Sequence, residues 1–406
     1  MLVDVIRRVL LVVIITVAAT VFPSWAAAQS SPGQGRFVTG PLAWTPTFQL
    51  HEAGVDSNVF NSPLNPKEDV TAGALSQVNT LLTLGILEAT TSGSLEYLYF
   101  DRYSQERGLN RRVATHLEFP VSRFSPDVTV AWNRVKERSG NEIDTRTPRT
   151  DFSYAAGIQT RFGSRVALTA TAGKQKQTYD RGFTFHDTEI AEQLNRESTL
   201  GTVSGRVTVT PLTVFAAQAS VGRDTFLLTP DADTDNLRVD AGFEFAPDAV
   251  IRGRASVGYH SMQPHRNVSN AVAANFAGVT SAVDLSYTLL ERTRFTGQFS
   301  RDSSYSIETN QPYYVSTAGS VEVLQTLFGP VDLTVRAARE KLDYPATDLE
   351  VAHVDFADTF GGGPSIRVGP QTVIALVYDS SERRSPRGPE FGYQRRRIYT
   401  TLTYEF

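Results

Sequence analysis

The sequence predicts an all-β fold, a transmembrane antiparallel up-and-down β-barrel of about 18 strands, with 16 as the alternative count. Short periplasmic turns and longer extracellular loops are expected to join the strands. Three observations predict this fold. The chain opens with a secretory signal pattern, continues in strand-like segments joined alternately by short and long connections, and ends in an alternating apolar strand with a terminal aromatic residue.

The last segment alternates in polarity. Every second residue from Ile398 to Phe406 carries bulk or a methyl group, and the residues between them are mostly polar. Such a strand presents one wall to lipid and the other to water. A closed barrel must seal its seam with a strand of this kind. The pattern resembles the C-terminal signal read by the barrel-assembly machinery, with Leu402, Tyr404 and Phe406 as its candidate residues.

Residues 1–28 have the pattern of a cleaved signal peptide. Arg7 and Arg8 precede an apolar run from Val9 to Val21, and Ala26 to Ala28 form the small-residue cleavage site. The run of about 13 residues is short for a membrane-spanning helix, which needs about 20. We therefore predict export and a bacterial outer-membrane location of the Gram-negative type. Residues 29–43 are predicted to be a short periplasmic segment, and residues 44–406 the barrel.

Composition excludes several classes of protein. Cysteine is absent, which excludes disulfides and thiolate metal sites. The net charge of −4 is spread along the chain, which argues against a nucleic-acid partner. No cofactor or metal is expected.

The strand prediction follows from period-two segments bounded by turn residues. The predicted strands are 44–52, 70–84, 92–106, 111–123, 126–138, 150–162, 164–178, 198–210, 212–225, 235–246, 248–262, 274–289, 292–306, 312–328, 330–343, 354–368, 370–384 and 394–406. Short turns are expected at 124–127, 162–164, 210–213, 246–249, 328–330 and 368–370, and a short helix is expected within the loop 179–197. Aromatic residues near the turns are expected to form an interfacial girdle.

Alternation also assigns the faces of the strands. Leu237, Val239 and Phe243 are expected to face lipid, whereas Arg238 and Asp240 face inward, because a lipid-facing arginine near mid-membrane costs about 2 to 4 kcal/mol. The resulting candidate pore-lining residues carry both signs of charge: Arg206, Arg238, Arg252, Arg254, Arg336, Glu118, Asp240, Glu244, Asp284, Glu322 and Asp332. Mixed signs predict a wet, weakly selective passage, and the alternative is an inner salt-bridge mesh that braces the barrel.

Simpler interpretations account for the residues that resemble catalytic and metal-binding patterns. His260 and Ser261 are adjacent in a strand and so point to opposite faces, which argues against a nucleophile and base. The histidines at 186 and 353 are interpreted as loop residues, and no catalytic residue is predicted.

Asp231, Asp233 and Asp235 alternate as in a calcium loop, but Asn236 and Gly242 replace the expected Gly and Glu, so weak cation binding is the most they suggest. Gly361 to Gly363 predict a bulge or a close strand approach.

Arginines crowd the last outer loop and its two strands. They are Arg383, Arg384, Arg387, Arg395, Arg396 and Arg397. Besides a simply solvated rim, they suggest outward contacts with lipopolysaccharide phosphates and an inward bias toward anions.

Residues 54–60, Gly-Val-Asp-Ser-Asn-Val-Phe, resemble the Gly-x-x-Asp-x-Asn-Ile/Val-Phe stretch near the start of putative beta-barrel porin 2 type outer-membrane proteins, a family associated with exopolysaccharide systems. Val55 stands where that motif usually has an aromatic residue. The resemblance implies a non-enzymatic transport channel. An outer-membrane location predicts outer-membrane lipid and lipopolysaccharide as partners, with a homo-oligomer and polysaccharide-export components as further candidates.

We therefore predict a porin-like channel for passive or system-coupled passage of small solutes or saccharides. Two alternatives remain: a closed structural or binding envelope barrel linked to polysaccharide export, and an outer-leaflet hydrolase. The hydrolase loses its support if alanine at His186, His260 and His353 leaves hydrolysis unchanged.

Overall fold

The computed structural model describes residues 37–406, so the predicted signal peptide at 1–28 lies outside the described residues. Its strands are β1 (Phe37–Thr39), β2 (Leu42–Asp56), β3 (Asp69–Leu84), β4 (Leu87–Phe100), β5 (Gly108–Glu118), β6 (Phe124–Glu137), β7 (Thr147–Phe162), β8 (Val166–Tyr179), β9 (Thr184–Phe185), β10 (Thr188–Glu189), β11 (Arg196–Thr210), β12 (Thr213–Phe226), β13 (Thr234–Phe245), β14 (Ile251–Pro264), β15 (Phe276–Leu289), β16 (Thr293–Tyr305), β17 (Tyr313–Phe328), β18 (Val331–Tyr344), β19 (His353–Val368), β20 (Thr372–Arg384) and β21 (Tyr393–Glu405). One α-helix, α2 (Ile190–Leu194), and short 3₁₀ turns at Ser104–Glu106, Pro230–Ala232 and Pro389–Phe391 lie in loops.

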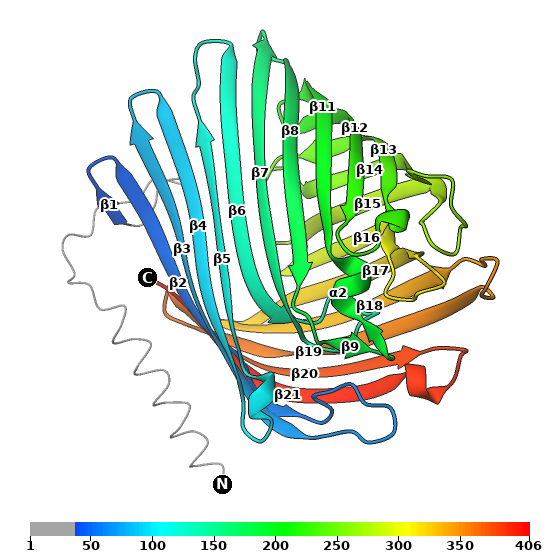
Figure 1. The fold of residues 1–406 in the computed structure, drawn as a ribbon. Coiled ribbons are helices and arrows are strands. Elements are labelled where there is room, and N and C mark those ends of the chain that lie inside the picture. Colours follow the sequence, from blue (N-terminus) through cyan, green and yellow to red (C-terminus); the bar gives the residue numbers. More distant parts are fainter. Residues whose placement is uncertain (1–36) are drawn as a thin grey trace.

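Eighteen long antiparallel strands close into one ring (Figure 1). Each strand pairs with the next along the chain, and β2 pairs with β21 to close the barrel. Strand β1 pairs only with the first residues of β2, beyond the end of β21. The predicted count of 18 is confirmed. Closure satisfies the backbone groups that an open sheet edge would expose to lipid.

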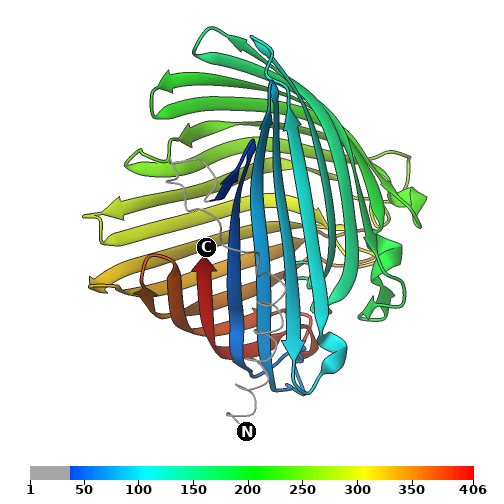
Figure 2. The same cartoon turned by 90° about the vertical axis from the view of Figure 1, so that its left-hand side faces the viewer.

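Short turns and long loops occupy opposite ends of the barrel. Figure 1 shows the turns at the upper left and the long loops at the lower right, and Figure 2 shows the last strand beside the first. The turn expected at 124–127 was misplaced, because Phe124 to Asp127 belong to β6 and the turn covers 119–123. There the backbone reverses between Val121 and Phe124, whose amide groups and carbonyls bond reciprocally, with Ser122 at φ 58°.

Strands β4 and β5 begin and end earlier than predicted. The prediction placed them at 92–106 and 111–123, whereas β4 starts at Leu87 and β5 ends at Glu118. Apolar residues occur at consecutive positions in this part of β4, including Leu98 beside Tyr97 and Tyr99, so alternation does not define a register there. The pairing with β3 sets the boundaries.

The outward face of the barrel is apolar along most of its height. Leu237, Val239 and Phe243 are 45%, 47% and 45% exposed, as expected of lipid-facing side chains. Directly paired residues of antiparallel strands share a face, so the ladder extends this assignment from strand to strand. The predicted faces of β13, β14 and β18 agree with it.

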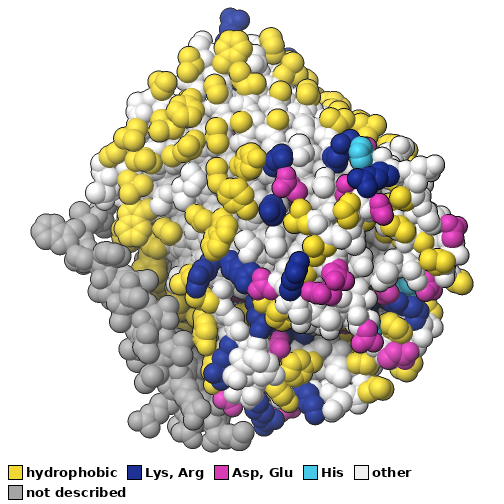
Figure 3. Space-filling model, viewed as in Figure 1, with side chains coloured by type: hydrophobic (Ala, Val, Ile, Leu, Met, Phe, Trp, Pro, Cys, Tyr) yellow, Lys and Arg dark blue, Asp and Glu magenta, His cyan; other side chains and the backbone are white. Residues whose placement is uncertain are grey.

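Charged side chains reach the outward face only toward the loop end of the strands. By the pairing register they include Arg301, Arg339, Lys341, Asp358, Arg384 and Arg396. Figure 3 shows hydrophobic side chains over the turn end and charged side chains gathered toward the loop end. A charge on the lipid face costs least near the interface, which explains this placement. Among residues 37–406, no helix is long and apolar enough to cross a membrane.

Candidate channel and its inward loop

The eleven candidate pore-lining residues all lie on the inward face. Arg238 and Asp240 alternate with the exposed Leu237 and Val239, and the ladder carries this face from Asp240 to its partners on β12 and β14. The other nine occupy positions of the same parity on their strands: Arg206, Arg252, Arg254, Arg336, Glu118, Glu244, Asp284, Glu322 and Asp332. Their side chains therefore face the lumen, as a pore-lining role requires.

Part of this set forms ion pairs and part does not. Arg206 pairs with Glu244, and Arg238 pairs with Asp302 of β16. Asp332 lies 3.4 Å from Arg367. Within residues 37–406, five of the eleven form no ion pair: Glu118, Arg252, Arg254, Asp284 and Glu322. Arg252 donates to the Ala249 carbonyl, and the other four face the lumen without a charged partner among the described residues. The inward face of this part of the chain therefore carries both ion pairs that link different strands and charged side chains without an ion-pair partner.

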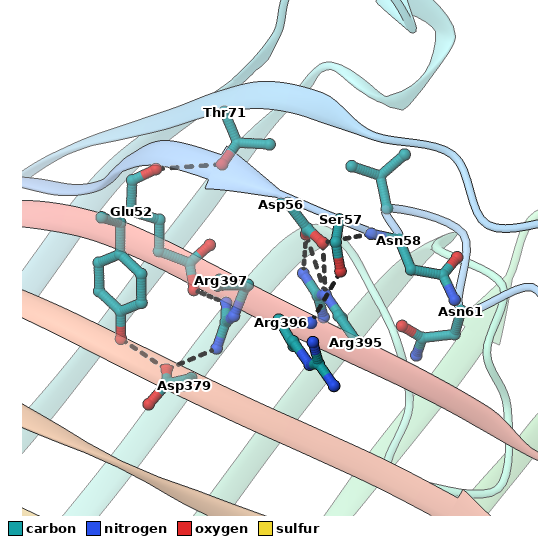
Figure 4. A network of polar contacts seen from close by, with 12 residues as sticks. Glu52, Asp56, Ser57, Asn58, Asn61, Thr71, Asp379, Arg395, Arg396 and Arg397 are labelled. Atoms are coloured by element: carbon teal, nitrogen blue, oxygen red, sulfur yellow. Dashed lines mark hydrogen bonds and ion pairs between the residues drawn. The ribbon is translucent and has the colours of Figure 1, made fainter.

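The segment 54–60 closes the barrel at its seam (Figure 4). Asp56, at the end of β2, accepts hydrogen bonds from Arg395 of β21, and Ser57 donates its backbone N–H to the Arg396 carbonyl at 2.9 Å. The Asn58 amide donates to the backbone carbonyls of Ser62 and Gln394 at 2.9 and 3.0 Å. A Cβ on Gly54 would lie 2.0 Å from the Ile398 carbonyl oxygen, so only glycine fits this strand approach. Asp56 and Asn58 of the motif therefore join the end of β2 to β21.

A second buried carboxylate, Asp379 of β20, supports the same seam. It accepts hydrogen bonds from Arg336 at 2.6 Å, from the Tyr399 hydroxyl at 2.8 Å and from Arg397 at 3.1 Å. A Cβ on Gly361 would lie 2.1 Å from the Asp379 Oδ1. The three-glycine run therefore makes a close strand approach, as predicted, and makes room for this carboxylate.

The inward arginines near the last loop are neutralised by carboxylates. Arg383 lies 2.8 Å from Asp355 and 3.4 Å from Asp144. Arg395 is paired with Asp56, and Arg397 with Asp379. The suggested bias of the mouth toward anions is therefore not favoured by these three residues. Arg384 and Arg396 face outward.

The loop 138–146 folds across the inside of the barrel. It leaves between β6 and β7, yet Glu142 accepts a hydrogen bond from the Ser306 hydroxyl at 2.6 Å, on the far side of the ring. The Arg383 guanidinium of β20 donates to the Glu142 carbonyl at 2.8 Å. On the near side, the guanidinium of Arg138 donates to the Val59 carbonyl at 2.6 Å. The alternation of the strands gives no sign of this crossing.

Glu142 is buried with its carboxyl group inside the loop contacts, and it is 2% exposed. Burial raises its pKa to about 7, and the nearby Glu308 also raises it, while hydrogen bonds from Ser306 and Ile307 and the charge of Arg383 lower it. The Tyr344 hydroxyl lies 3.3 Å from the same oxygen. Proton uptake by this carboxyl group is therefore coupled to the position of the loop.

An apolar cluster joins three loops at the outer end of the lumen. Ile143 packs with Ile190, Ala191 and Leu194 of α2 and with Ile307. The predicted loop helix is thus confirmed, and its apolar side faces this cluster. Together the loops narrow the lumen.

Below and beside these loops the lumen remains hollow. A cavity of about 340 Å³ lies between Asn141 of the inward loop and wall residues that include Arg254 and Asp284. A second cavity of about 550 Å³ is lined by polar inward residues such as Thr129 and Arg238. The walls of both cavities combine charged and polar side chains with apolar ones, and the charged side chains fit a hydrated interior.

His260 has partners that do not form a catalytic relay. Its Nδ1 lies 3.0 Å from the Ser303 hydroxyl and 3.4 Å from Asp302, while its Nε2 faces the amide oxygen of Asn236 at 3.2 Å. In a catalytic relay the acid and the nucleophile contact different nitrogens of the histidine ring. Here Asp302 and the Ser303 hydroxyl both lie beside Nδ1 of His260. The sequence did not indicate Ser303 as a partner, because it lies 43 residues away in the chain.

The three aspartates of the calcium-like loop bind different partners. Asp231 pairs with Arg266, Asp235 with Arg223, and Asp233 accepts the Phe226 amide at 2.8 Å. Their carboxylates do not converge. Within residues 37–406 no group of three or more metal-binding side chains is found.

Comparison with known proteins agrees with this architecture. The family model described as putative beta-barrel porin 2 matches residues 40–406. The chain belongs to this family. The porin-type family and fold imply the bacterial outer membrane as its location.

Solved structures of similar fold are outer-membrane proteins. OccAB4 of Acinetobacter baumannii is 10% identical over 89% of this chain and 98% of its own, with a TM-score of 0.50. OpdK of Pseudomonas aeruginosa, solved with vanillate, gives the same identity, coverage and TM-score. At this identity the likeness concerns the fold alone. No curated protein sequence matches the chain.

Proposed function

We propose that this family member is an outer-membrane channel that passes small solutes or saccharides through a barrel narrowed by the loop 138–146. One observation carries the proposal: charges of both signs without ion-pair partners among residues 37–406, such as Arg254 and Asp284, line a lumen cavity beneath this loop. A barrel of about 18 strands is wide enough to hold water, unlike an eight-stranded one. Mixed charges favour weak selectivity among small polar solutes.

A closed structural or binding barrel linked to polysaccharide export is the second candidate. The apolar contact of Ile143 with Ile190 and Ile307 favours it, because this contact joins loops from opposite sides of the mouth. The two functions differ in whether solute crosses the barrel.

The proposed partners follow from location and surface. Arg384 and Arg396 project outward at the loop end, where lipopolysaccharide phosphates would meet them. Export through a cleaved signal peptide and recognition of Leu402, Tyr404 and Phe406 by the barrel-assembly machinery complete the proposed route. A homo-oligomer and polysaccharide-export components remain proposed partners of the channel.

Liposome swelling tests the channel function directly. Proteoliposomes holding the purified protein should swell in isotonic glucose and more slowly in larger saccharides, because diffusion through a narrowed bore falls with solute size. A variant in which 140–144 is replaced by a shorter Gly-Ser linker should swell faster. If parent and shortened-loop variant both swell no faster than empty liposomes, the closed barrel is the correct interpretation.

A further inference from the structure

A cavity at the outer mouth is separate from the lumen cavities. Its volume is about 640 Å³, and four extracellular loops line it: 180–195, 306–312, 345–352 and 385–392. Small-molecule sites in proteins commonly have volumes of about 300 to 1,000 Å³. We propose that this cavity binds a neutral saccharide, which deepens the proposed function by placing a capture site at the channel entrance.

Two polar atoms beside the cavity are buried without a hydrogen-bond partner. They are the Nε2 of His353 and the Nε of Arg387. A buried polar atom left unpaired costs about 1 to 3 kcal/mol, so a site that leaves two of them around one cavity gains when a ligand supplies the missing partners. Because His353 and Arg387 both line the cavity, a ligand that enters it would contact this wall.

The walls are held in place before any ligand arrives. His353 stacks on the buried Tyr344 with ring centroids 4.3 Å apart. The Arg387 guanidinium lies 4.1 Å from the Phe391 ring centre, and His186 contacts the same ring at 4.7 Å. These contacts fix the side chains without using the free Nε2 and Nε atoms. Such preorganisation lowers the entropy cost of binding.

The loops themselves are also tied together. The Gln311 side chain donates to the carbonyls of Pro345 and Val351 at 3.0 and 3.1 Å, and the Thr347 hydroxyl donates to the Asn310 carbonyl at 2.9 Å. Loops 306–312 and 345–352 therefore move as one unit. These hydrogen bonds between the two loops maintain the cavity between them.

Charge and hydrogen-bonding capacity identify the ligand class. The Arg387 cation is neutralised by Glu308 at 2.8 Å, and Glu350 adds a further negative charge, so the cavity offers no excess positive charge to an anion. The lining mixes donors such as Asn310 and acceptors such as Glu308. Hydroxyl groups both donate and accept, and a saccharide carries many of them on a compact frame.

Isothermal titration calorimetry on the detergent-solubilised protein tests the site, with maltose as probe and glucuronate and inorganic phosphate as anionic comparisons. Saturable maltose binding is expected, tighter than binding of either anion. His353→Phe keeps the stacking on Tyr344 but removes Nε2, and should weaken maltose binding by about tenfold, the effect of one buried hydrogen bond. Glu308→Gln, which preserves shape, should weaken it severalfold.

The matched control is His265→Phe, because His265 pairs with Asp235 at the rim outside the cavity. It should bind maltose as the parent does. The inference is overturned if maltose shows no saturation, if both His353→Phe and Glu308→Gln bind as tightly as the parent, or if phosphate binds more tightly. Calorimetry measures binding and does not depend on conduction through the barrel. A protein that binds maltose but passes no solute would therefore contradict the channel function and still support this binding site.

Discussion

The Arg395 guanidinium of β21 donates hydrogen bonds to the Asp56 carboxylate of β2, with its Nε 3.0 and 2.9 Å from the two carboxylate oxygens. The two residues lie 339 positions apart in the chain, and Asp56 is 1% exposed. Barrel closure is therefore reinforced by a buried ion pair as well as by the backbone ladder. A buried pair is costly to break because the remaining charge stays buried.

Asp56→Asn should lower the free energy of unfolding by about 3 to 5 kcal/mol, because Arg395 loses its counter-charge while it remains enclosed. Urea titration in lipid vesicles measures the change. Asp231→Asn is the control, since Asp231 and Arg266 form an exposed pair worth less than about 1 kcal/mol. Equal effects of the two substitutions would show that the seam pair has no special role.

Gly361→Val should displace Asp379 and cost about 3 kcal/mol, because a Cβ would occupy the place of the Asp379 Oδ1 and its bonds to Arg336 and Arg397 would be lost. Unfolding by guanidinium, followed by tryptophan fluorescence, gives the change. Gly297→Val is the matched control, because nothing lies within 4 Å of its added Cβ. A smaller loss at 361 than at 297 would contradict the assigned role of Gly361.

The inward loop should respond to pH through Glu142. Its pKa is about 7 when docked and near the ordinary 4.5 when released into water, so the docked loop binds the proton more tightly. Docking is thus favoured by acid and weakens as pH rises through 7. Between pH 5 and pH 8 the equilibrium constant for release of the loop should rise by about 70-fold, which lengthens the time spent in the higher-conductance state. Glu142→Gln should flatten this dependence, and an unchanged pH profile in that variant would refute the coupling.

Neighbouring positions on β14 should differ sharply in their tolerance of charge. Val257 is 59% exposed on the lipid face, whereas Ser256 lies on the inward face. Val257→Lys should destabilise the barrel by about 2 to 4 kcal/mol, and Ser256→Lys by less than about 1 kcal/mol, when unfolding is measured in bilayers. The reverse order would contradict the assignment of faces.

The sequence predicted the strands and faces because alternation and turn residues are local properties. The 18 strands and the inward placement of residues such as Arg238 and Asp284 follow from period-two patterns. The boundary of β4 was missed because Tyr97, Leu98 and Tyr99 are all apolar.

The contacts within the lumen could not be predicted, because they join residues far apart in the chain. Glu142 meets Ser306 at a separation of 164 residues, and Asp56 meets Arg395 at 339. The only local signals were the motif at 54–60 and the three glycines at 361–363, which marked where strands approach closely. Their partners required the folded barrel.

Planar-bilayer recording of the purified protein tests the central claim most directly. We predict discrete conductance steps for the parent chain and larger steps when 140–144 is replaced by a short Gly-Ser linker, because that loop crosses the lumen. A correctly folded barrel that gives no steps in either form would contradict the account of a hydrated passage.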